Sequence, residues 1–222
     1  MTQAGGRLTA ELQKKFASYA EETGKRFYVM YGQTEATARM SYLPYKKSLE
    51  KCGSIGVAIP NGKFFLINEE NKKITDCNTV GELGYTGKNV SLGYAEEAKD
   101  LAKGDENQGV LLTGDMAKFD KDGFYWLVGR KKRFLKIFGN RINLDETEDI
   151  LKTRFCNVDL ACSGVDDKIH IYVTDNKIVD DVRQYLSDKM ALNHIAITVK
   201  YINEIPKNES GKTAYKGLGD SL

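Results

Sequence analysis

Five short stretches of the chain carry side chains whose types could bind a phosphate-bearing ligand and act on it. One of them, Tyr31-Gly32-Gln33-Thr34-Glu35, sets an aromatic ring close to a hydroxyl and a carboxylate. The ring offers a stacking surface. The hydroxyl and carboxylate can address a phosphate oxygen and a Mg²⁺ ion, because Mg²⁺ prefers hard oxygen ligands. The residues alone are equally compatible with a polar loop in which Glu35 is solvated.

Two glycine-bearing turns could complete such a site. Gly5 and Gly6 stand just before an expected helix, and paired glycines let a flat ligand approach the backbone closely. Asp115 follows Thr113-Gly114, where its carboxylate can accept hydrogen bonds from both hydroxyls of a ribose. A plain helix-entry turn and a turn-capping aspartate are the alternatives at these two places.

Basic residues gather in one further stretch. Arg130 to Arg133 is followed by Lys136, Gly139 and Arg141, and Ser210-Gly211-Lys212 echoes this cluster near the end of the chain. Lys and Arg can neutralise the charge that develops during attack on a phosphoryl group. The alternatives are a solvated basic face for the cluster and an ordinary tail lysine for Lys212.

The elements that must position these residues begin with an amphipathic helix over residues 8 to 23. Its apolar members at helical spacing are Leu8, Leu12, Phe16 and Tyr19. A short buried strand over 27–30 then leads into the Tyr31 loop, and the chain from about 42 to 128 is β-rich.

Two features of the β-rich part stand out. The fifth stretch, from Gly81 to Gly87 and on to Gly93-Tyr94, has the dense glycines of tight β turns, which favours a structural interpretation. The clearest hairpin joins residues 116–119 to 124–128, because Asp122-Gly123 can supply the positive φ angles of a tight turn.

The chain changes character at Gly129-Arg130, beyond which helices and strands alternate. Asn143 and Glu146 form a capping-box pattern at the start of a helix. The apolar stripe of that helix comprises Leu144, Ile150, Leu151 and Phe155. Strands are expected over 169–173 and 195–202, with a helix over 178–186 between them. The tail from Asn208 to Leu222 bears Gly and Lys and is predicted to be mobile.

Composition excludes several classes of protein. The chain has 222 residues, 41% hydrophobic and 29% charged, with a net charge of +2, so it offers no strong field for nucleic acid. No apolar run approaches the roughly 20 residues of a membrane helix, and the start lacks the order of a signal peptide. The four cysteines match no zinc spacing and are interpreted as reduced, mostly buried thiols. The expected location is cytoplasmic.

Together these residues resemble the superfamily of acyl-CoA synthetases, peptide-synthetase adenylation domains and firefly luciferases. Five motifs stand in the order of that family, YGQTE, GELGYTGKNVSLGY, LLTGD, GRKKRFLKIFGNRI and NESGK, and the resemblance covers about residues 3 to 216. It implies an α+β protein in two parts. Residues 1–129 would be the β-rich, distorted barrel-like end of a large nucleotide-binding domain. Residues 130–222 would be a small mobile α+β domain with a hinge near 130–132.

The resemblance also implies a role for individual residues. In the first part, Gly5 and Gly6 would form the adenine loop, Tyr31 would stack on the base, Thr34 would contact the α-phosphate, Glu35 would help hold Mg²⁺ and Asp115 would bind the ribose. In the second part, Arg130 would lie near the ribose, Lys132 would be the hinge, Gly139 would line the path of a pantetheine arm and Lys212 would bridge carboxylate and phosphate oxygens.

The implied reaction uses ATP, Mg²⁺ and a carboxylic acid to form an acyl-AMP, whose acyl group then passes to a thiol such as coenzyme A. Little proton transfer is needed, so alignment and charge neutralisation carry the catalysis. A non-catalytic nucleotide-binding or regulatory protein derived from such a ligase is the alternative. Nucleic-acid binding through residues 130–136 is a third hypothesis, which the near-neutral net charge disfavours.

Three departures from the family pattern qualify the expectation. Leu111 and Leu112 stand where an aromatic and a basic residue are usual, and Lys132 stands where many relatives have Asp. The second part is also shorter than usual. More importantly, the chain contains no Ser/Thr/Gly-rich loop ending in Pro-Lys. We therefore expect a fragment, or one half of a split enzyme with an upstream partner, that does not adenylate alone.

Overall fold

The computed structural model describes residues 1–6, 8–209 and 211–219. The chain divides into two compact units, Met1–Val128 and Gly129–Leu222. Each unit has its own hydrophobic clusters, so each is described by itself. Among the described ranges, no helix has the length and apolar composition needed to cross a membrane.

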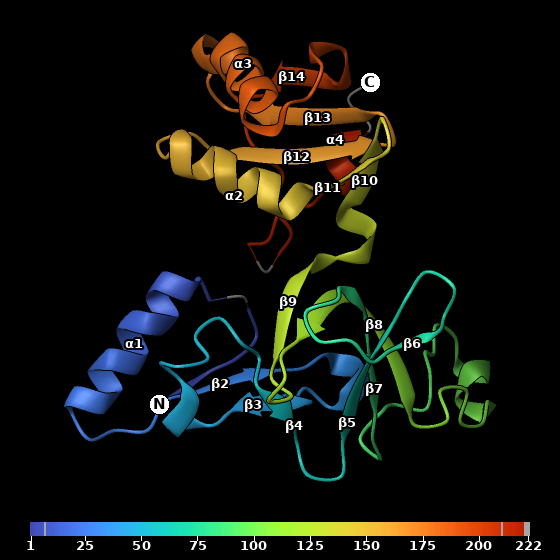
Figure 1. The fold of residues 1–222 in the computed structure, drawn as a ribbon. Helices are drawn as coiled ribbons and strands as arrows, with labels where there is room; N and C mark the ends of the chain where they lie inside the picture. The colour runs from blue at the N-terminus through green and yellow to red at the C-terminus, as the bar shows by residue number, and fades with distance from the viewer. Residues whose placement is uncertain (7, 210, 220–222) are drawn as a thin grey trace. The chain divides into compact units, whose positions relative to one another are not determined.

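Two sheets build the first unit (Figure 1). The four-stranded sheet has the order β1-β2-β3-β4, with strands Thr2–Gln3, Tyr28–Tyr31, Ser41–Leu43 and Val57–Ala58. The five-stranded sheet has the order β6-β5-β7-β8-β9, with β5 at Lys63–Ile67, β6 at Lys73–Ile74, β7 at Gly81–Thr86, β8 at Val110–Phe119 and β9 at Tyr125–Arg130. Its order runs between two edge strands, so the barrel-like shape expected from the sequence is not found as a closed barrel.

Helix α1 spans Ala10–Glu22 and uses a different face from the one that the amphipathic pattern predicts. The Oγ1 atom of Thr9 caps its start by accepting from the Leu12 amide at 3.3 Å. Leu12, Phe16 and Tyr19 of the predicted stripe remain 43%, 42% and 46% exposed, whereas Gln13, Ala17 and Ala20 are buried. The prediction of the core-facing side was wrong because the alanines, on the neighbouring face, pack into the cluster around Phe27, Val29 and Leu43.

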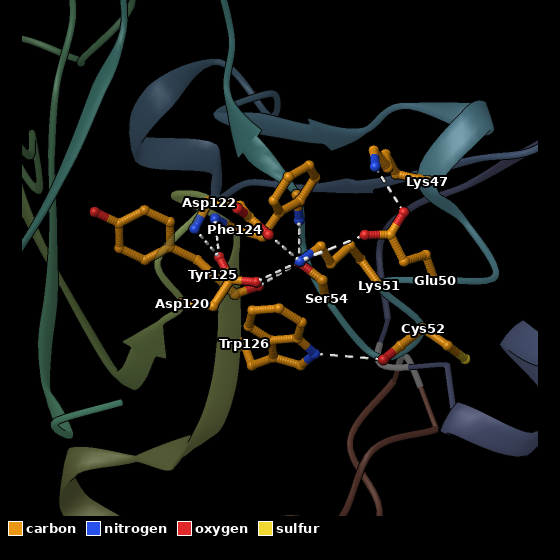
Figure 2. Close-up of polar contacts among 11 residues, drawn as sticks. Lys47, Glu50, Lys51, Cys52, Ser54, Asp120, Asp122, Phe124, Tyr125 and Trp126 are labelled. Atoms are coloured by element: carbon orange, nitrogen blue, oxygen red, sulfur yellow. Dashed lines mark hydrogen bonds and ion pairs between the residues drawn. The ribbon is translucent and has the colours of Figure 1, made fainter. Parts of the chain in front are cut away.

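The β8–β9 hairpin is fastened to the segment before β4 by an ionic cluster centred on Lys51, which we call the Lys51 cluster (Figure 2). Lys51 Nζ lies 2.8 Å from Asp120 Oδ2 and 2.6 Å from Asp122 Oδ2, on the turn of the hairpin. Close by, Ser54 Oγ donates to the Tyr125 carbonyl at 2.7 Å. Gly123 has φ +79°, as predicted for this turn.

The second unit is a three-stranded sheet with two helices packed on it (Figure 1). The sheet has the order β12-β13-β14, with strands Leu160–Val165, Lys168–Val173 and Ile197–Tyr201. Helix α2 spans Leu144–Arg154, α3 spans Val179–Met190 and the short α4 spans Lys216–Gly219. A two-stranded ladder joins β10, Phe134–Ile137, to β11, Asn140–Asn143.

Local patterns located these elements well. The side chain of Asn143 caps α2 by accepting from the Asp145 amide at 3.0 Å, so the Asn143 half of the predicted capping box is present. Leu144 and Leu151 of the predicted stripe are buried in the main cluster of the unit. Strands β13 and β14 and helix α3 overlap the three elements predicted over 169–202.

One expectation about exposure was wrong. Cys77 and Cys156 are exposed and Cys52 is half-buried, so only Cys162 fits the expectation of buried thiols. The exposed pair lie in a loop after β6 and just beyond the end of α2, where no core covers them. In the tail, α4 forms and Leu218 is only 2% exposed, although this segment is predicted to be mobile.

Candidate functional site

The two loops predicted to hold a nucleotide leave the four-stranded sheet at one edge. Strands β1 and β2 are parallel, with Gln3 paired to Val29. The carboxyl ends of parallel strands meet at the same edge of a sheet, where open α/β sheets bind their ligands. Gly5 and Gly6 follow β1 and the Tyr31 loop follows β2. Gly5 has φ +89°, a conformation that favours glycine, and a Cβ on either glycine would meet open space.

The loop after Tyr31 folds back tightly on itself. Thr34–Ala36 form a single 3₁₀ turn, and Thr37 and Ala38 follow with φ of 51° and 63°. A Cβ on Gly32 would lie 2.7 Å from the Ala38 backbone, so any larger residue there must push the loop open. This close approach holds Thr34 and Glu35 next to the end of β2.

Tyr31 and Asp115 come together although 84 positions separate them. Tyr31 Oη donates to Asp115 Oδ2 at 2.6 Å, and Gln33 Nε2 donates to the same oxygen at 3.0 Å. Gln33 Nε2 also reaches the Thr113 carbonyl at 3.0 Å. Asp115 is only 5% exposed, and its amide donates to Thr113 Oγ1 at 3.1 Å. Two residues singled out from separate stretches thus share one hydrogen-bonded group, with Gln33 as a third member.

Glu35 meets a second aromatic hydroxyl. Tyr94 Oη donates to Glu35 Oε1 at 2.6 Å, which raises the pKa of Tyr94 above its ordinary value because the neutral phenol is the better donor to a carboxylate. The amide of Ser91 donates to the Glu35 carbonyl at 2.8 Å. In the described part of the chain, no group of three or more His, Cys, Asp and Glu side chains could hold a metal ion. A Mg²⁺ ion here would take further oxygen ligands from a phosphate, as it commonly does.

The glycine-dense stretch that includes β7 supports the loop, as its structural interpretation predicts. Asn89 Nδ2 donates to the Ala36 carbonyl at 2.8 Å and to that of Arg39 at 3.1 Å. Tyr85 Oη donates in turn to Asn89 Oδ1 at 2.9 Å. A Cβ on Gly84 would lie 2.2 Å from the Phe65 ring, so the close packing of β5 on β7 requires glycine there.

Sequence reasoning gave no individual role to Gln33, Asn89 or Tyr94. All three lie within motifs that carried the resemblance, and that position in the sequence is the only signal that marks them. Their partners become evident only when the loops are folded against each other.

Four predicted residues belong to the second unit. The Arg130 amide donates to Asp145 Oδ2 at 3.3 Å, and Lys132 lies in the 3₁₀ turn Lys131–Arg133 just beyond β9. Gly139, with φ +85°, lies in the turn between β10 and β11. The fourth residue, Lys212, is described next.

Lys212 lies on a small hairpin. Lys207 pairs with Thr213 across it, and the Asn208 amide donates to the Lys212 carbonyl at 2.8 Å. Asn208 Oδ1 accepts from the Lys212 amide at 2.9 Å, while Gly211 supplies a φ of +76° at the turn. Lys212 is exposed at this tip. Ser210 of the same motif lies outside the described residues.

Comparison with known proteins agrees with these features. Residues 1–95 match the family described as AMP-binding enzyme. The 4-hydroxybutyrate–CoA ligase 1 of Metallosphaera sedula is 28% identical over 94% of this chain and 39% of its own length. Luciferin 4-monooxygenase of Photuris pensylvanica is 26% identical over 94% of this chain and 40% of its own length.

Solved structures show the same fold. O-succinylbenzoate coenzyme A synthetase of Bacillus subtilis, in complex with ATP and magnesium ion, superposes with a TM-score of 0.73 at 23% identity, over 99% of this chain and 46% of its own. The ATP-bound RpMatB-BxBclM chimera B1 superposes with a TM-score of 0.76 at 21% identity, over 99% of this chain and 45% of its own.

These matches define the class that the chain resembles: it is similar to AMP-forming ligases, peptide-synthetase adenylation domains and luciferases, and its residues 1–95 match the AMP-binding enzyme family. The resemblance inferred from the five motifs is thereby confirmed. Within that class it is a part of the fold, since it spans about two fifths of the length of the curated ligase and luciferase relatives named above.

Proposed function

We propose that this chain is the part of an AMP-forming acid–thiol ligase that binds the adenosine of ATP and supplies the catalytic lysine. The observation that supports this best is the hydrogen bond between Tyr31 and Asp115, at 2.6 Å. It joins the ring proposed to stack on adenine to the carboxylate proposed to bind ribose. Gly5 and Gly6 leave the same edge of the sheet, where they can border the flat face of a base.

In the proposed first step, a carboxylate oxygen of the substrate attacks the α-phosphorus of ATP. The bond from that phosphorus to the bridging oxygen breaks, and pyrophosphate leaves with the electron pair. In the second step the sulfur of a thiol attacks the acyl carbon, AMP leaves with its phosphate oxygen, and the thiol proton passes to solvent. In both steps the protein has to align the reactants and to place positive charge beside the phosphate.

On the first unit, Thr34 is proposed to donate its hydroxyl to the α-phosphate, one residue from Glu35. Glu35 offers a hard carboxylate oxygen that fits Mg²⁺, and Tyr94 orients this carboxylate through its hydrogen bond. A bound Mg²⁺ ion would neutralise phosphate charge. The chain's own part is to hold the Glu35 carboxylate in place, through the backbone bond from Ser91 and the folded-back loop.

On the second unit, Lys212 is proposed to stabilise the charge that builds up between carboxylate and α-phosphate during the first step. Arg130 is assigned to the ribose side, as the resemblance implies. Lys132 is the proposed hinge of a mobile small domain, in the 3₁₀ turn after β9, and Gly139 is proposed to border the path of the incoming thiol. The acceptor proposed is coenzyme A, because several relatives are named as CoA ligases.

Nucleotide binding by the purified chain tests the assignment of Asp115. Asp115→Asn removes the charge that accepts from the ribose and should weaken AMP binding by about 10- to 100-fold, since a hydrogen bond to a charged group contributes roughly 1.5–3 kcal/mol. The measurement is calorimetric titration with AMP. Asp76→Asn is the matched control, because Asp76 is exposed and lies after β6. Equal AMP affinity of Asp115→Asn and the unaltered chain would contradict the proposal.

We further propose that complete adenylation needs a partner segment with the phosphate-binding loop that these 222 residues do not contain. Pyrophosphate release from ATP, Mg²⁺ and a library of carboxylic acids measures this directly. Release above background from the chain alone would overturn the proposed dependence. If AMP binds through Asp115 but no complementing segment restores release, the alternative of a non-catalytic nucleotide-binding protein is favoured instead.

A further inference from the structure

A buried ionic cluster in the second unit touches the segment that carries Lys212. It is centred on Arg133, and we call it the Arg133 cluster. Arg133 Nε donates to Asp145 Oδ1 at 2.8 Å, Nη1 donates to the Cys162 carbonyl at 2.6 Å, and Nη2 contacts Glu148. The Arg133 side chain is only 10% exposed. Its three directions of hydrogen bonding leave one open face of the planar guanidinium for stacking.

The ring of Tyr215 uses that face. The guanidinium carbon of Arg133 lies 3.9 Å from the ring centroid, which is close for a cation–π contact. Tyr215 Oη also donates to Glu148 Oε2 at 3.2 Å. Tyr215 is therefore bound to the cluster twice, once through its ring and once through its hydroxyl.

The hairpin that carries Lys212 is short, and the chain is held in place both before and after it. On the incoming side, Ile205 is 6% exposed and packs with Ala161 and Tyr172. On the outgoing side, the Ala214 amide donates to the Pro206 carbonyl at 2.8 Å, and Tyr215 follows at once. Tyr215 is thus the first residue after the hairpin that is attached to the interior by its side chain.

The backbone of Arg133 belongs to the turn that contains the proposed hinge. Arg133 closes the 3₁₀ turn Lys131–Arg133, the turn that contains Lys132. The side chain of Arg133 thus connects the proposed hinge turn to Tyr215. Tyr215 in turn follows the hairpin that carries Lys212, the proposed catalytic lysine. Both ends of this link lie in the second unit.

We propose that Tyr215 is a positioning residue for Lys212: its ring, stacked on Arg133 and hydrogen-bonded to Glu148, sets the height and direction of the 207–213 hairpin. The ammonium of Lys212 is then presented from a fixed base, although the residue itself is exposed. The functional part of this inference rests on the proposed function, because only the ligase reaction gives Lys212 a task. The structural part, that Tyr215 orders the hairpin, stands by itself.

Amide hydrogen exchange of the full chain tests the anchor. In Tyr215→Leu, exchange of the hydrogen-bonded amides of Asn208, Gly211 and Lys212 should rise about tenfold, the equivalent of one strong cation–π contact. Amides of β12 and β13 should keep their protection. Tyr215→Phe keeps the ring on Arg133 and should restore most of the protection, with the amide chemical shifts of Gly211 and Lys212 returning toward those of the unaltered chain.

The matched control is Tyr201→Leu, because Tyr201 is a tyrosine of this unit that is 47% exposed and whose hydroxyl donates to Asn203 Oδ1 at 3.0 Å. It should leave the hairpin amides unchanged. Unchanged hairpin exchange in Tyr215→Leu would overturn the proposal. So would a loss of protection across the whole three-stranded sheet, since the residue would then serve the core and not the hairpin.

The outcome is independent of the nucleotide experiment. If the chain fails to bind AMP but the hairpin amides behave as expected, the proposed function is contradicted and the positioning role of Tyr215 is not. A chain that binds AMP through Asp115 while Tyr215→Leu changes nothing at the hairpin would do the reverse.

Discussion

The Lys51 cluster of the first unit and the Arg133 cluster of the second are built from the same chemistry at different depths. Each places one cation near an aromatic ring and surrounds it with carboxylates, three at Lys51 and two at Arg133. Lys51 Nζ lies 5.3 Å from the Phe124 ring centroid, and its partner Asp122 is 46% exposed. Arg133 lies 3.9 Å from the Tyr215 centroid, and its partner Glu148 is 6% exposed.

The comparison shows how burial decides what such a cluster does. The Lys51 side chain is itself only 12% exposed, but its partner Asp122 is 46% exposed, so water can hydrate that carboxylate when the contact is lost. The Arg133 cluster is different because Glu148 is only 6% exposed, so this carboxylate keeps its charge with little water to hydrate it when the guanidinium is removed. Arg also presents a planar face for stacking while its edge donates, which a Lys ammonium cannot do. The deeper cluster can therefore link three segments of the chain, those of Arg133, Glu148 and Tyr215.

The largest expected effect breaks the deeper cluster. Arg133→Met removes the cation of Asp145 and leaves the buried Glu148 with only the half-exposed Lys152, at 3.0 Å, so it should lower the free energy of unfolding of the second unit by up to about 3–5 kcal/mol. Urea unfolding followed by circular dichroism measures this. Arg183→Met is the control, because Arg183 pairs with an Asp180 side chain that is 90% exposed, and it should cost about 0.5 kcal/mol or less. Similar losses in the two variants would remove the distinction drawn from burial.

A smaller effect is expected at the Lys51 cluster. Lys51→Met should lower the stability of the first unit by about 1–3 kcal/mol, because two hydrogen bonds to carboxylates are lost while Asp120 and Asp122 remain partly hydrated. Lys72→Met, at a Glu70 pair in which both side chains are about 70% exposed, is the control and should change stability little. A loss at Lys51 as large as that at Arg133 would show that depth does not separate the clusters.

The smallest expected effect is a pH dependence of the shallower cluster. Partial burial alone would raise the pKa of Asp120, but hydrogen bonds from Lys51 and from the Phe124 and Asp122 amides outweigh it and hold that pKa below its usual range. A carboxyl with a lowered folded-state pKa stabilises the fold above its unfolded pKa of about 3.9 and loses this contribution as the pH falls toward the folded value.

The first unit should therefore lose stability below about pH 4, and Lys51→Met should lose less of it over the same range. Thermal unfolding at pH 6 and at pH 3 measures the difference. Parallel losses in the two proteins would show that the Asp120 carboxyl is not coupled to Lys51.

Local sequence patterns located α2, α3, β13 and β14 of the second unit but gave no prediction of strands β10, β11 and β12. The Asn143 cap, the buried Leu144 and Leu151 and the alternation of β14 all follow from interactions between residues near in sequence, which is why their positions were predicted within a few residues. The same reasoning missed the hairpin of the tail, because its order comes from Tyr215 and Leu218 meeting the interior from a distance.

The sequence by itself determined which residue types are available for chemistry and in what order, and that order was enough to recognise the class of protein. Only the tertiary structure decided which of them meet. Tyr31 reaches Asp115 because β2 and β8 are brought together, and α1 buries Ala17 and Ala20 instead of Leu12 and Phe16 because of what lies beneath it. The physical reason is that periodicity reports only neighbours along one element, whereas contact between elements depends on sheet order and packing.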